Sequence, residues 1–307
     1  MKIGYFADGP WSHEALKMLE EKDFIEVAFL VPRYKTTDFF LKNWAEKNKV
    51  PFLKQKNVND LNFLKKIKKF KTELNVSMSF NQILKKEIIN LSPKGFINCH
   101  AGALPFYRGR NPLNWVLING EKSFGITVHF IDEGIDTGDI INQKIIPISD
   151  NDNYSSLLKK SINGCADLLV KSIIEIHENS FKRISQKDLH PIGSYFSKRG
   201  IGDEKITWLQ SSRKCFDFIR AISHPGPHAR TFLENKEYAI LNSELINYNS
   251  AEKFLPGEIA GIESEGNIIK TADGFLLLKE MAEVCESDTL KETFCPRFEI
   301  GTKFLEK

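Results

Sequence analysis

The sequence predicts an α/β protein: a Rossmann-like, mostly parallel sheet in the N-terminal part and a smaller, β-barrel-like (OB-like) domain in the C-terminal part. Two observations support this prediction. In residues 1–187, apolar strand-like runs alternate with segments of helical spacing, which implies βαβ units with right-handed crossovers. In residues 206–307, short strand-like runs are separated by turn residues, as in small barrels. The Gly-rich, charged segment 188–205 is the expected linker between the two domains, 1–187 and 206–307.

The individual elements follow from period-2 and period-3.6 patterns of apolar residues. Ser12 precedes the first helical pattern and is expected to cap that helix. We expect N-terminal strands over 2–7, 25–32, 74–80, 95–99, 123–134 and 138–148. We expect helices over 12–22, 36–49, 61–71, 83–91, 112–120 and 154–177. The C-terminal strands are expected over 236–246, 257–262, 267–272 and 274–283.

The composition is that of an ordinary globular protein, with 41% hydrophobic residues, 27% charged residues and a formal net charge of +3 over 307 residues. The Lys-rich stretch 64–71 is compatible with a solvated helix face or, alternatively, with a nucleic-acid stripe. Five Cys without C-x-x-C spacing argue for a reducing compartment, and we expect a cytoplasmic protein. No signal peptide is recognised, and no window approaches the ~18 apolar residues of a spanning helix, so no membrane partner is expected.

A polar pair, Asn98 and His100, lies where the predicted strand 95–99 ends. In parallel α/β sheets, ligands bind outside the carboxyl ends of the strands. Cys99 lies between the two and is expected to face the opposite side, into the core. The first βα turn lacks G-x-G-x-x-G, and there is no Walker-type loop, so a dinucleotide cofactor is not indicated. The pair is therefore a candidate for chemistry of another kind.

A second polar cluster, 131–140, reads IDEGIDTGDI and contains three Asp residues and one Glu. A metal site is conceivable, but the spacing is not that of a calcium-binding loop. Asp side chains that bond their own backbone in a turn are a second interpretation. A third is that one of these carboxylates meets Asn98 and His100. The residues by themselves leave all three open.

Taken together, the motifs N-x-H (98–100), L-P-x-Y-R-G (104–109) and D-T-G (136–138) resemble the signature of the folate-dependent formyltransferases. In this pattern Asp136 follows His100 by 36 residues. The C-terminal part, from the I-T-W at 206–208 onward, resembles the accessory β-domain of several members. The family includes methionyl-tRNA formyltransferase and N-formyltransferases that act on nucleotide-linked amino sugars.

The resemblance implies transfer of a formyl group from N10-formyltetrahydrofolate to an amine, with Asn98, His100 and Asp136 as the catalytic set. His100 would serve as general base and acid. Asn98 would donate a hydrogen bond to the oxyanion, and Asp136 would orient the imidazole and stabilise its charged form. The reaction requires no metal.

By the same resemblance, the formyl donor lies beside the strand ends, between segment 79–84 and the loop around the D-T-G motif. For any single apolar side chain there, packing between strand and helix is an equal alternative. The expected donor-binding residues are Phe80, Ile83, Leu84, Asp132 and Gly134.

Two features favour a nucleotide-linked amino (dideoxy) sugar, destined for a surface glycan, as the acceptor. Segments 107–115 and 194–208 resemble the sugar enzymes, and Arg is suited to phosphate oxygens. The alternative is methionyl-tRNA formyltransferase acting on charged initiator tRNA, although the modest net charge speaks against a nucleic-acid partner. The resemblance is compatible with a homodimer. The expected substrate-binding residues are Trp11, Ser12, Tyr107, Arg110, Asn114, Trp115 and Tyr195.

Overall fold

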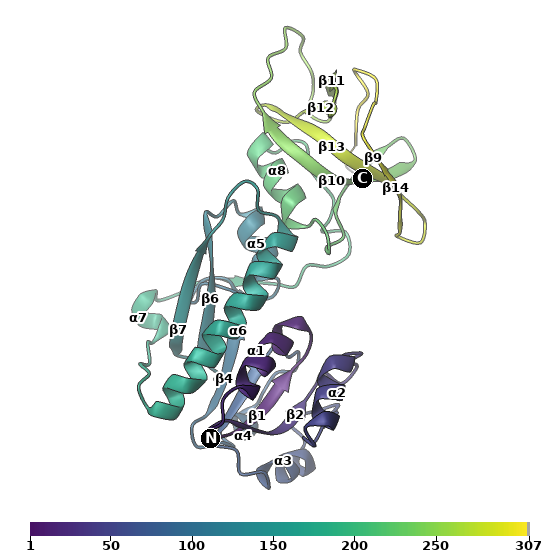
Figure 1. Ribbon diagram of the computed structural model, residues 1–307. Coiled ribbons are helices and arrows are strands. Elements are labelled where there is room, and N and C mark those ends of the chain that lie inside the picture. The colour runs from purple at the N-terminus through teal and green to yellow at the C-terminus, as the bar shows by residue number, and fades with distance from the viewer. Residues whose placement is uncertain (306–307) are drawn as a thin grey trace. The chain divides into compact units, whose positions relative to one another are not determined.

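The computed structural model describes residues 1–305, and the chain divides into two compact units. Figure 1 shows the order of the elements along the chain. The first unit comprises Met1–Pro112, Ser123–Pro147 and Lys159–Phe196. The second comprises Leu113–Lys122, Ile148–Leu158 and Ser197–Lys307.

The first unit is built on a six-stranded sheet with the order β2-β1-β3-β4-β6-β7. The first four strands in this order pair in parallel, and the last two pair antiparallel to their neighbours. This confirms the predicted Rossmann-like, mostly parallel sheet. The strands are β1 (Lys2–Ala7), β2 (Glu26–Val31), β3 (Leu74–Met78), β4 (Phe96–His100), β6 (Ser123–Phe130) and β7 (Ile140–Pro147).

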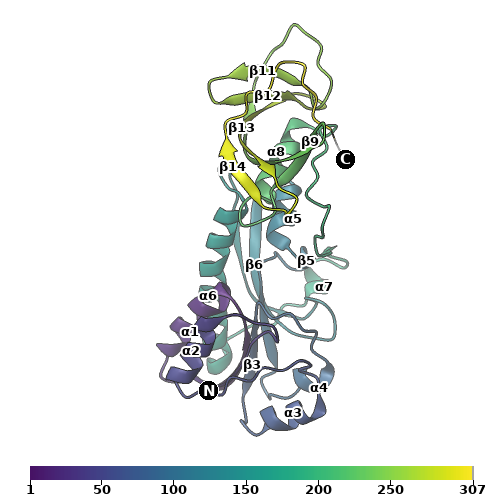
Figure 2. The same cartoon turned by 90° about the vertical axis from the view of Figure 1, so that its right-hand side faces the viewer.

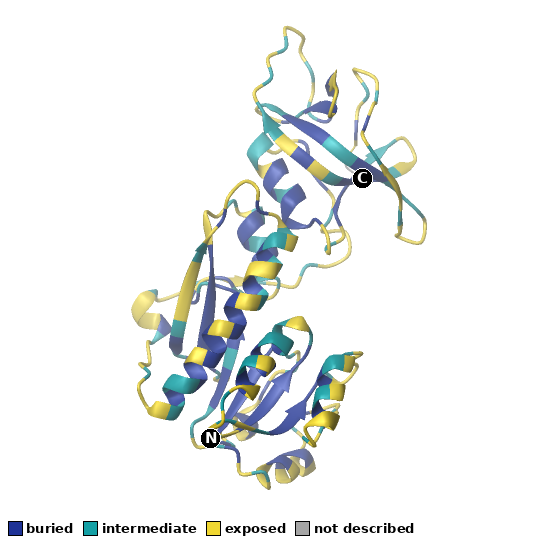
Figure 3. Cartoon of the chain, in the orientation of Figure 1, coloured by how far each residue is buried: buried dark blue, intermediate teal, exposed yellow. Residues whose placement is uncertain are grey.

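Helices cover both faces of this sheet. Figure 2 shows α1, α2 and α6 on one side and α3 and α4 on the other. Buried positions therefore run almost without interruption along the central strands, as expected for a parallel sheet covered twice (Figure 3). The helices are α1 (Pro10–Glu20), α2 (Phe39–Lys47), α3 (Leu61–Lys68), α4 (Lys86–Ile89) and α6 (Tyr154–Glu178).

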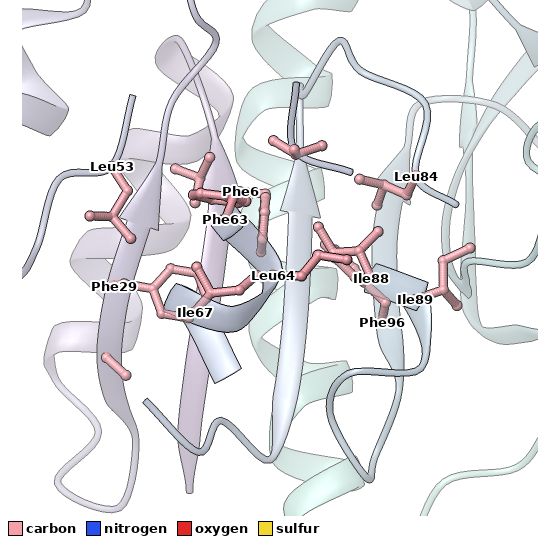
Figure 4. Close-up of a cluster of buried hydrophobic side chains, with 13 residues drawn as sticks. Phe6, Phe29, Leu53, Phe63, Leu64, Ile67, Leu84, Ile88, Ile89 and Phe96 are labelled. Carbon is pink, nitrogen blue, oxygen red and sulfur yellow. The ribbon is translucent and has the colours of Figure 1, made fainter. Parts of the chain in front are cut away.

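A core of large apolar side chains fixes the sheet against α3 and α4 (Figure 4). Phe6 lies at its centre and makes an edge contact with Phe29 at 5.7 Å between ring centroids and a tilted contact with Phe96 at 4.9 Å. Phe6 also contacts the ring of Phe80 at 5.7 Å. This packing holds rigid the segment that follows β3 and, with it, one wall of the cavity described below.

The start of α1 differs from the expectation. The helix begins at Pro10, and its N-cap is Gly9 in a left-handed conformation (φ 74°), so Ser12 does not cap it. Pro suits the first helical position because its missing N–H would lack a partner there anyway. The Ser12 hydroxyl is buried and donates to the Gly9 carbonyl at 2.7 Å.

Three short elements complete the first unit. Strand β5 (Arg108–Gly109) pairs in parallel with β8 (Tyr195–Phe196), and helix α7 (Gln186–Leu189) precedes β8. The segment after α6 thereby contacts the loop that follows the N-x-H motif.

The second unit contains an antiparallel sheet with the order β11-β12-β13-β10-β9, with β14 paired to β13. It confirms a smaller β-rich C-terminal domain, in which Trp208 is among the largest fully buried side chains. The sequence patterns missed α8, β9 and β14. No helix within residues 1–305 has the length and apolar character needed to cross a membrane. The elements are α5 (Pro112–Ile118), α8 (Ser212–Ala221), β9 (Ala229–Leu233), β10 (Lys236–Ile246), β11 (Ile259–Glu263), β12 (Gly266–Lys270), β13 (Phe275–Val284) and β14 (Leu290–Phe294).

Candidate active site

A cavity of 430 Å³ lies in the first unit, among residues from the ends of β3, β4 and β6 and the loop after β6. This volume is within the range of small-molecule sites. The cavity is lined by the expected catalytic and donor-binding residues Asn98, His100, Asp136, Phe80, Ile83, Leu84, Asp132 and Gly134.

Asn98 and His100 lie on one face of β4, because residues two apart in a strand point the same way. In the antiparallel register with β6, Asn98 is opposite His129 and His100 is opposite Thr127. Cys99 between them is buried, and its thiol donates to the Cys165 carbonyl at 3.6 Å. The strand thus presents its polar pair to the cavity.

The proton on His100 is fixed by its surroundings. Nε2 lies 2.7 Å from the Tyr107 carbonyl, which can only accept, so Nε2 carries a hydrogen. Nδ1 is then the basic nitrogen, 3.7 Å from Oδ2 of Asp136. Gly102 is required beside this ring, because a Cβ there would lie 2.6 Å from Nε2.

Asp136 has two imidazole neighbours: its Oδ2 faces His100, and its Oδ1 is 3.5 Å from Nε2 of His129. The Gly109 amide donates to Oδ2 at 2.9 Å. Burial favours the neutral acid, but the positive charges of His100 and His129 when protonated, the close approach of His129 and the Gly109 amide outweigh it. Together they hold the pKa of Asp136 well below its usual range.

Sequence reasoning missed His129, which completes the cluster. Its Nδ1 donates to the Phe130 carbonyl at 2.7 Å, so Nε2 is the nitrogen that faces Asp136 and the Asn98 amide, the latter at 3.4 Å. The one available signal was a His on an alternating strand, seven residues before the D-T-G Asp.

Chemically, the cluster can take up and stabilise a proton. In their neutral forms, both His100 and His129 direct an unprotonated nitrogen at the same carboxylate. A proton arriving at Nδ1 of His100 would therefore form a cation beside Asp136. Asn98 has two amide hydrogens, of which His129 takes one, which leaves a donor for a developing negative charge.

The residues expected to bind the acceptor are distributed unevenly. Arg110 and Tyr195 line the cavity. Tyr195 is half-exposed, and the Arg110 side chain has no hydrogen-bonding or ionic partner among residues 1–305. Tyr107 is buried, and its ring stacks on Phe196 at 4.8 Å.

Tyr107 and the other four residues expected to bind the acceptor are not among those that line the cavity. Ser12 and Trp11 belong to the first turn of α1, where the Ser12 side chain is buried. Asn114 and Trp115 belong to the second unit. There the Asn114 amide donates to the Ala221 carbonyl at 2.7 Å, and the Trp115 indole donates to the Ser197 carbonyl at 3.1 Å. Within residues 1–305, no group of three or more His, Cys, Asp or Glu is arranged to hold a metal ion.

Comparison with known proteins decides the family. Residues 12–173 match the formyl transferase family, and residues 202–293 match the formyl transferase C-terminal domain. This chain belongs to the formyltransferases. Over 227 residues it is 36% identical to methionyl-tRNA formyltransferase of Thermodesulfovibrio yellowstonii. The aligned region covers 74% of this chain and 71% of that protein.

This formyltransferase also resembles the bifunctional polymyxin resistance protein ArnA of Wigglesworthia glossinidia brevipalpis, at 36% identity over 67% of this chain and 31% of that protein. Among solved structures, a 4-N formyltransferase from Francisella tularensis aligns with a TM-score of 0.62 and 25% identity, over 76% of this chain and 93% of that one. The sugar 3N-formyl transferase WlaRD, solved with dTDP and 5-N-formyl-THF, shares the fold with a TM-score of 0.69 and 24% identity, over 91% and 97% of the two chains.

Proposed function

We propose that this formyltransferase moves a formyl group from N10-formyltetrahydrofolate to the amino group of a nucleotide-linked amino sugar. The observation that carries the proposal is the convergence of Asn98, His100 and Asp136 on one cavity. It combines a base, an amide donor and a carboxylate, which are the three groups that acyl transfer to an amine needs. No metal takes part in this proposal.

His100 acts through Nδ1. As the amine nitrogen bonds to the formyl carbon, Nδ1 accepts a proton from that nitrogen. As the bond from the formyl carbon to N10 breaks, the same proton passes to N10. Asp136 stabilises the intervening imidazolium, and the free amide hydrogen of Asn98 is donated to the oxyanion. Losing one such donor typically costs about 2.7–4 kcal/mol of transition-state stabilisation.

The walls of the cavity suit a reduced pterin. Phe80, Ile83 and Leu84 provide apolar lining, and the loop with Asp132 and Gly134 provides polar lining. A flat ring whose edges donate and accept hydrogen bonds matches such a slot. The folate ligand in the WlaRD structure supports this assignment.

Arg110 supports a phosphorylated acceptor. Its guanidinium borders the cavity and has no partner of its own within residues 1–305, so it is available for two phosphate oxygens. Tyr195 offers an exposed ring beside it, where a sugar or a base can pack. The sugar formyltransferases among the solved structures support the same acceptor class.

Methionyl-tRNA formylation is the second candidate, because several relatives at 32–36% identity carry that name. Charge argues against it. Residues 197–307, which include the accessory domain, contain 15 Lys and Arg against 18 Asp and Glu, a formal net charge of −3. A domain that neutralises several tRNA phosphates would be expected to carry excess positive charge.

The test is an acceptor panel with purified protein and N10-formyltetrahydrofolate. UDP-, dTDP-, GDP- and CDP-linked amino sugars are compared with charged initiator methionyl-tRNA, and the released tetrahydrofolate and formylated product are quantified. We expect turnover with at least one sugar nucleotide. Turnover of the tRNA alone, with affinity that falls steeply as salt rises, would establish the second candidate instead.

A further inference from the structure

Gln186 is a buried side chain, 2% exposed, that connects the Asp136 loop to strand β5. Its Nε2 donates to the carbonyls of Asp136 and Gly138, each at 2.8 Å. Its Oε1 accepts from Nε and Nη2 of Arg108, at 3.0 and 2.8 Å. Both amide hydrogens and both oxygen lone pairs are therefore used.

The bonds to the loop hold Asp136 in an uncommon backbone conformation. Asp136 has φ 54°, in the left-handed region that costs a residue with a Cβ about 1–2 kcal/mol. Such a conformation persists only where the surroundings over-determine it. Fixing the Asp136 carbonyl and the carbonyl two residues later gives that constraint, and it aims the carboxylate at the imidazoles.

The bonds to Arg108 hold the neighbouring segment 107–109, whose backbone contacts both Asp136 and His100. Arg108 is followed by Gly109, whose amide donates to Oδ2 of Asp136. It is preceded by Tyr107, whose carbonyl accepts from Nε2 of His100. The Gln186 side chain therefore holds two segments. One is the loop that carries Asp136, and the other is segment 107–109, which orients the Asp136 carboxylate and the His100 imidazole.

We infer that Gln186 is a positioning residue that keeps the Asp136 carboxylate beside His100 and His129. It is not among the residues that line the cavity, so it acts through Asp136 and not on the reacting atoms. The inference rests on the proposed roles of His100 and Asp136 in formyl transfer.

A purely structural role predicts something different. A residue that only stabilises the fold lowers the active fraction by the same factor whether or not Asp136 is present. A residue that works by placing the carboxylate matters only while the carboxylate is there, so the two losses do not multiply.

The experiment is a double-mutant cycle with Gln186→Glu and Asp136→Asn. Gln186→Glu keeps an acceptor for Arg108 but removes both hydrogens donated to the loop. With the sugar nucleotide that the acceptor panel identifies, we expect kcat to fall about 100-fold, the usual scale for a displaced catalytic group. In the Asp136→Asn background the same change should cost less than 3-fold. Gln186→Leu provides a second test, because it removes the hydrogen bonds without introducing a charge.

Asn267 provides the matched control. It is a fully buried amide of the second unit that donates to the carbonyls of Gly261 and Phe298 at 3.3 and 3.0 Å. Asn267→Leu should lower the Tm as much as the Gln186 variants do and leave kcat within 2-fold.

The outcomes separate the two proposals. If Asp136→Asn is as active as the wild type, the proposed function fails. If Asp136→Asn keeps only a small residual activity and Gln186→Glu lowers that activity by the same factor as in the wild type, or has no effect in the wild type, only the positioning role fails.

Discussion

The first unit contains two clusters in which a histidine meets a largely buried carboxylate, and they differ in how the carboxylate is used. Asp38 caps α2 and accepts from the amides of Gly9 and Leu41 at 2.7 and 3.1 Å and from His13 at 2.7 Å. Asp136 has its imidazole neighbours at 3.5 and 3.7 Å and borders a cavity. Neither Asp38 nor His13 is among the residues that line that cavity.

The difference separates a carboxylate whose hydrogen bonds are satisfied within the fold from one that borders a cavity, to which we assign a role in catalysis. Asp38 is saturated by short hydrogen bonds, and it occupies the Gly9 amide at the start of α1, where an external anion could otherwise bind. Asp136 holds two imidazoles at distances longer than hydrogen bonds, an arrangement that can tighten when a proton and a substrate arrive. Both carboxylates have a lowered pKa, so the pKa alone does not distinguish them.

The largest expected contrast is between Asp136→Asn and Asp38→Asn. A carboxylate that stabilises a catalytic imidazolium typically contributes up to about 10⁴-fold to kcat. We therefore expect a loss of about 10³- to 10⁴-fold for Asp136→Asn and a change below 3-fold for Asp38→Asn, measured as kcat for formyl transfer. Equal losses would mean that the two clusters do not differ in the way described.

Removing the amide donor should have the next largest effect. Asn98→Ala should lower kcat by about 10²- to 10³-fold, because the oxyanion loses a preorganised donor. Asn98→Asp keeps the size of the side chain but can only accept when ionised, so its loss should be at least as great. An active Asn98→Asp enzyme would rule out hydrogen-bond donation as the role of this residue.

The smallest expected effect concerns stability. Asp38→Ala removes a helix cap and should lower the free energy of unfolding by about 1–2 kcal/mol. Although burial opposes ionisation, hydrogen bonds from His13, Leu41 and Gly9 hold the pKa of Asp38 below its usual value. Since the folded-state pKa is the lower one, this stabilisation is present above about pH 4 and is lost as the pH falls through the folded-state pKa. The free energy of unfolding of the wild type and of Asp38→Ala is measured by chemical denaturation at several pH values. If the difference between the two grows on acidification, the role of ionised Asp38 as a stabilising cap is contradicted.

The local patterns of the sequence predicted the sheet and most of its helices, because strand burial and turn chemistry depend on neighbouring residues. The three motifs of the cavity were identified by their resemblance to the folate-dependent formyltransferases and not by these patterns. Gln186 could not be found in this way, because its partner Arg108 lies 78 residues away and their contact depends on how loops pack. His129 required the antiparallel register that places it opposite Asn98.

The sequence around Arg110 shows a second limit of prediction from local patterns. Segment 107–115 looked like one substrate-binding unit, but it spans the boundary between the two compact units. Arg110 borders the cavity, whereas the Asn114 amide is used by a backbone carbonyl of the second unit. Nearness in the sequence could not show which residues of this segment line the cavity and which belong to the second unit.

The most direct test compares the two histidines of the two clusters. Formyl transfer from N10-formyltetrahydrofolate is measured for His100→Ala and His13→Ala, with Tm recorded for both. General-base catalysis typically contributes about 10²- to 10⁴-fold, so His100→Ala should lose activity on that scale with little change in Tm. His13→Ala should lose Tm and keep kcat within 3-fold. A His100→Ala enzyme as active as the wild type would contradict the central claim, whatever the acceptor.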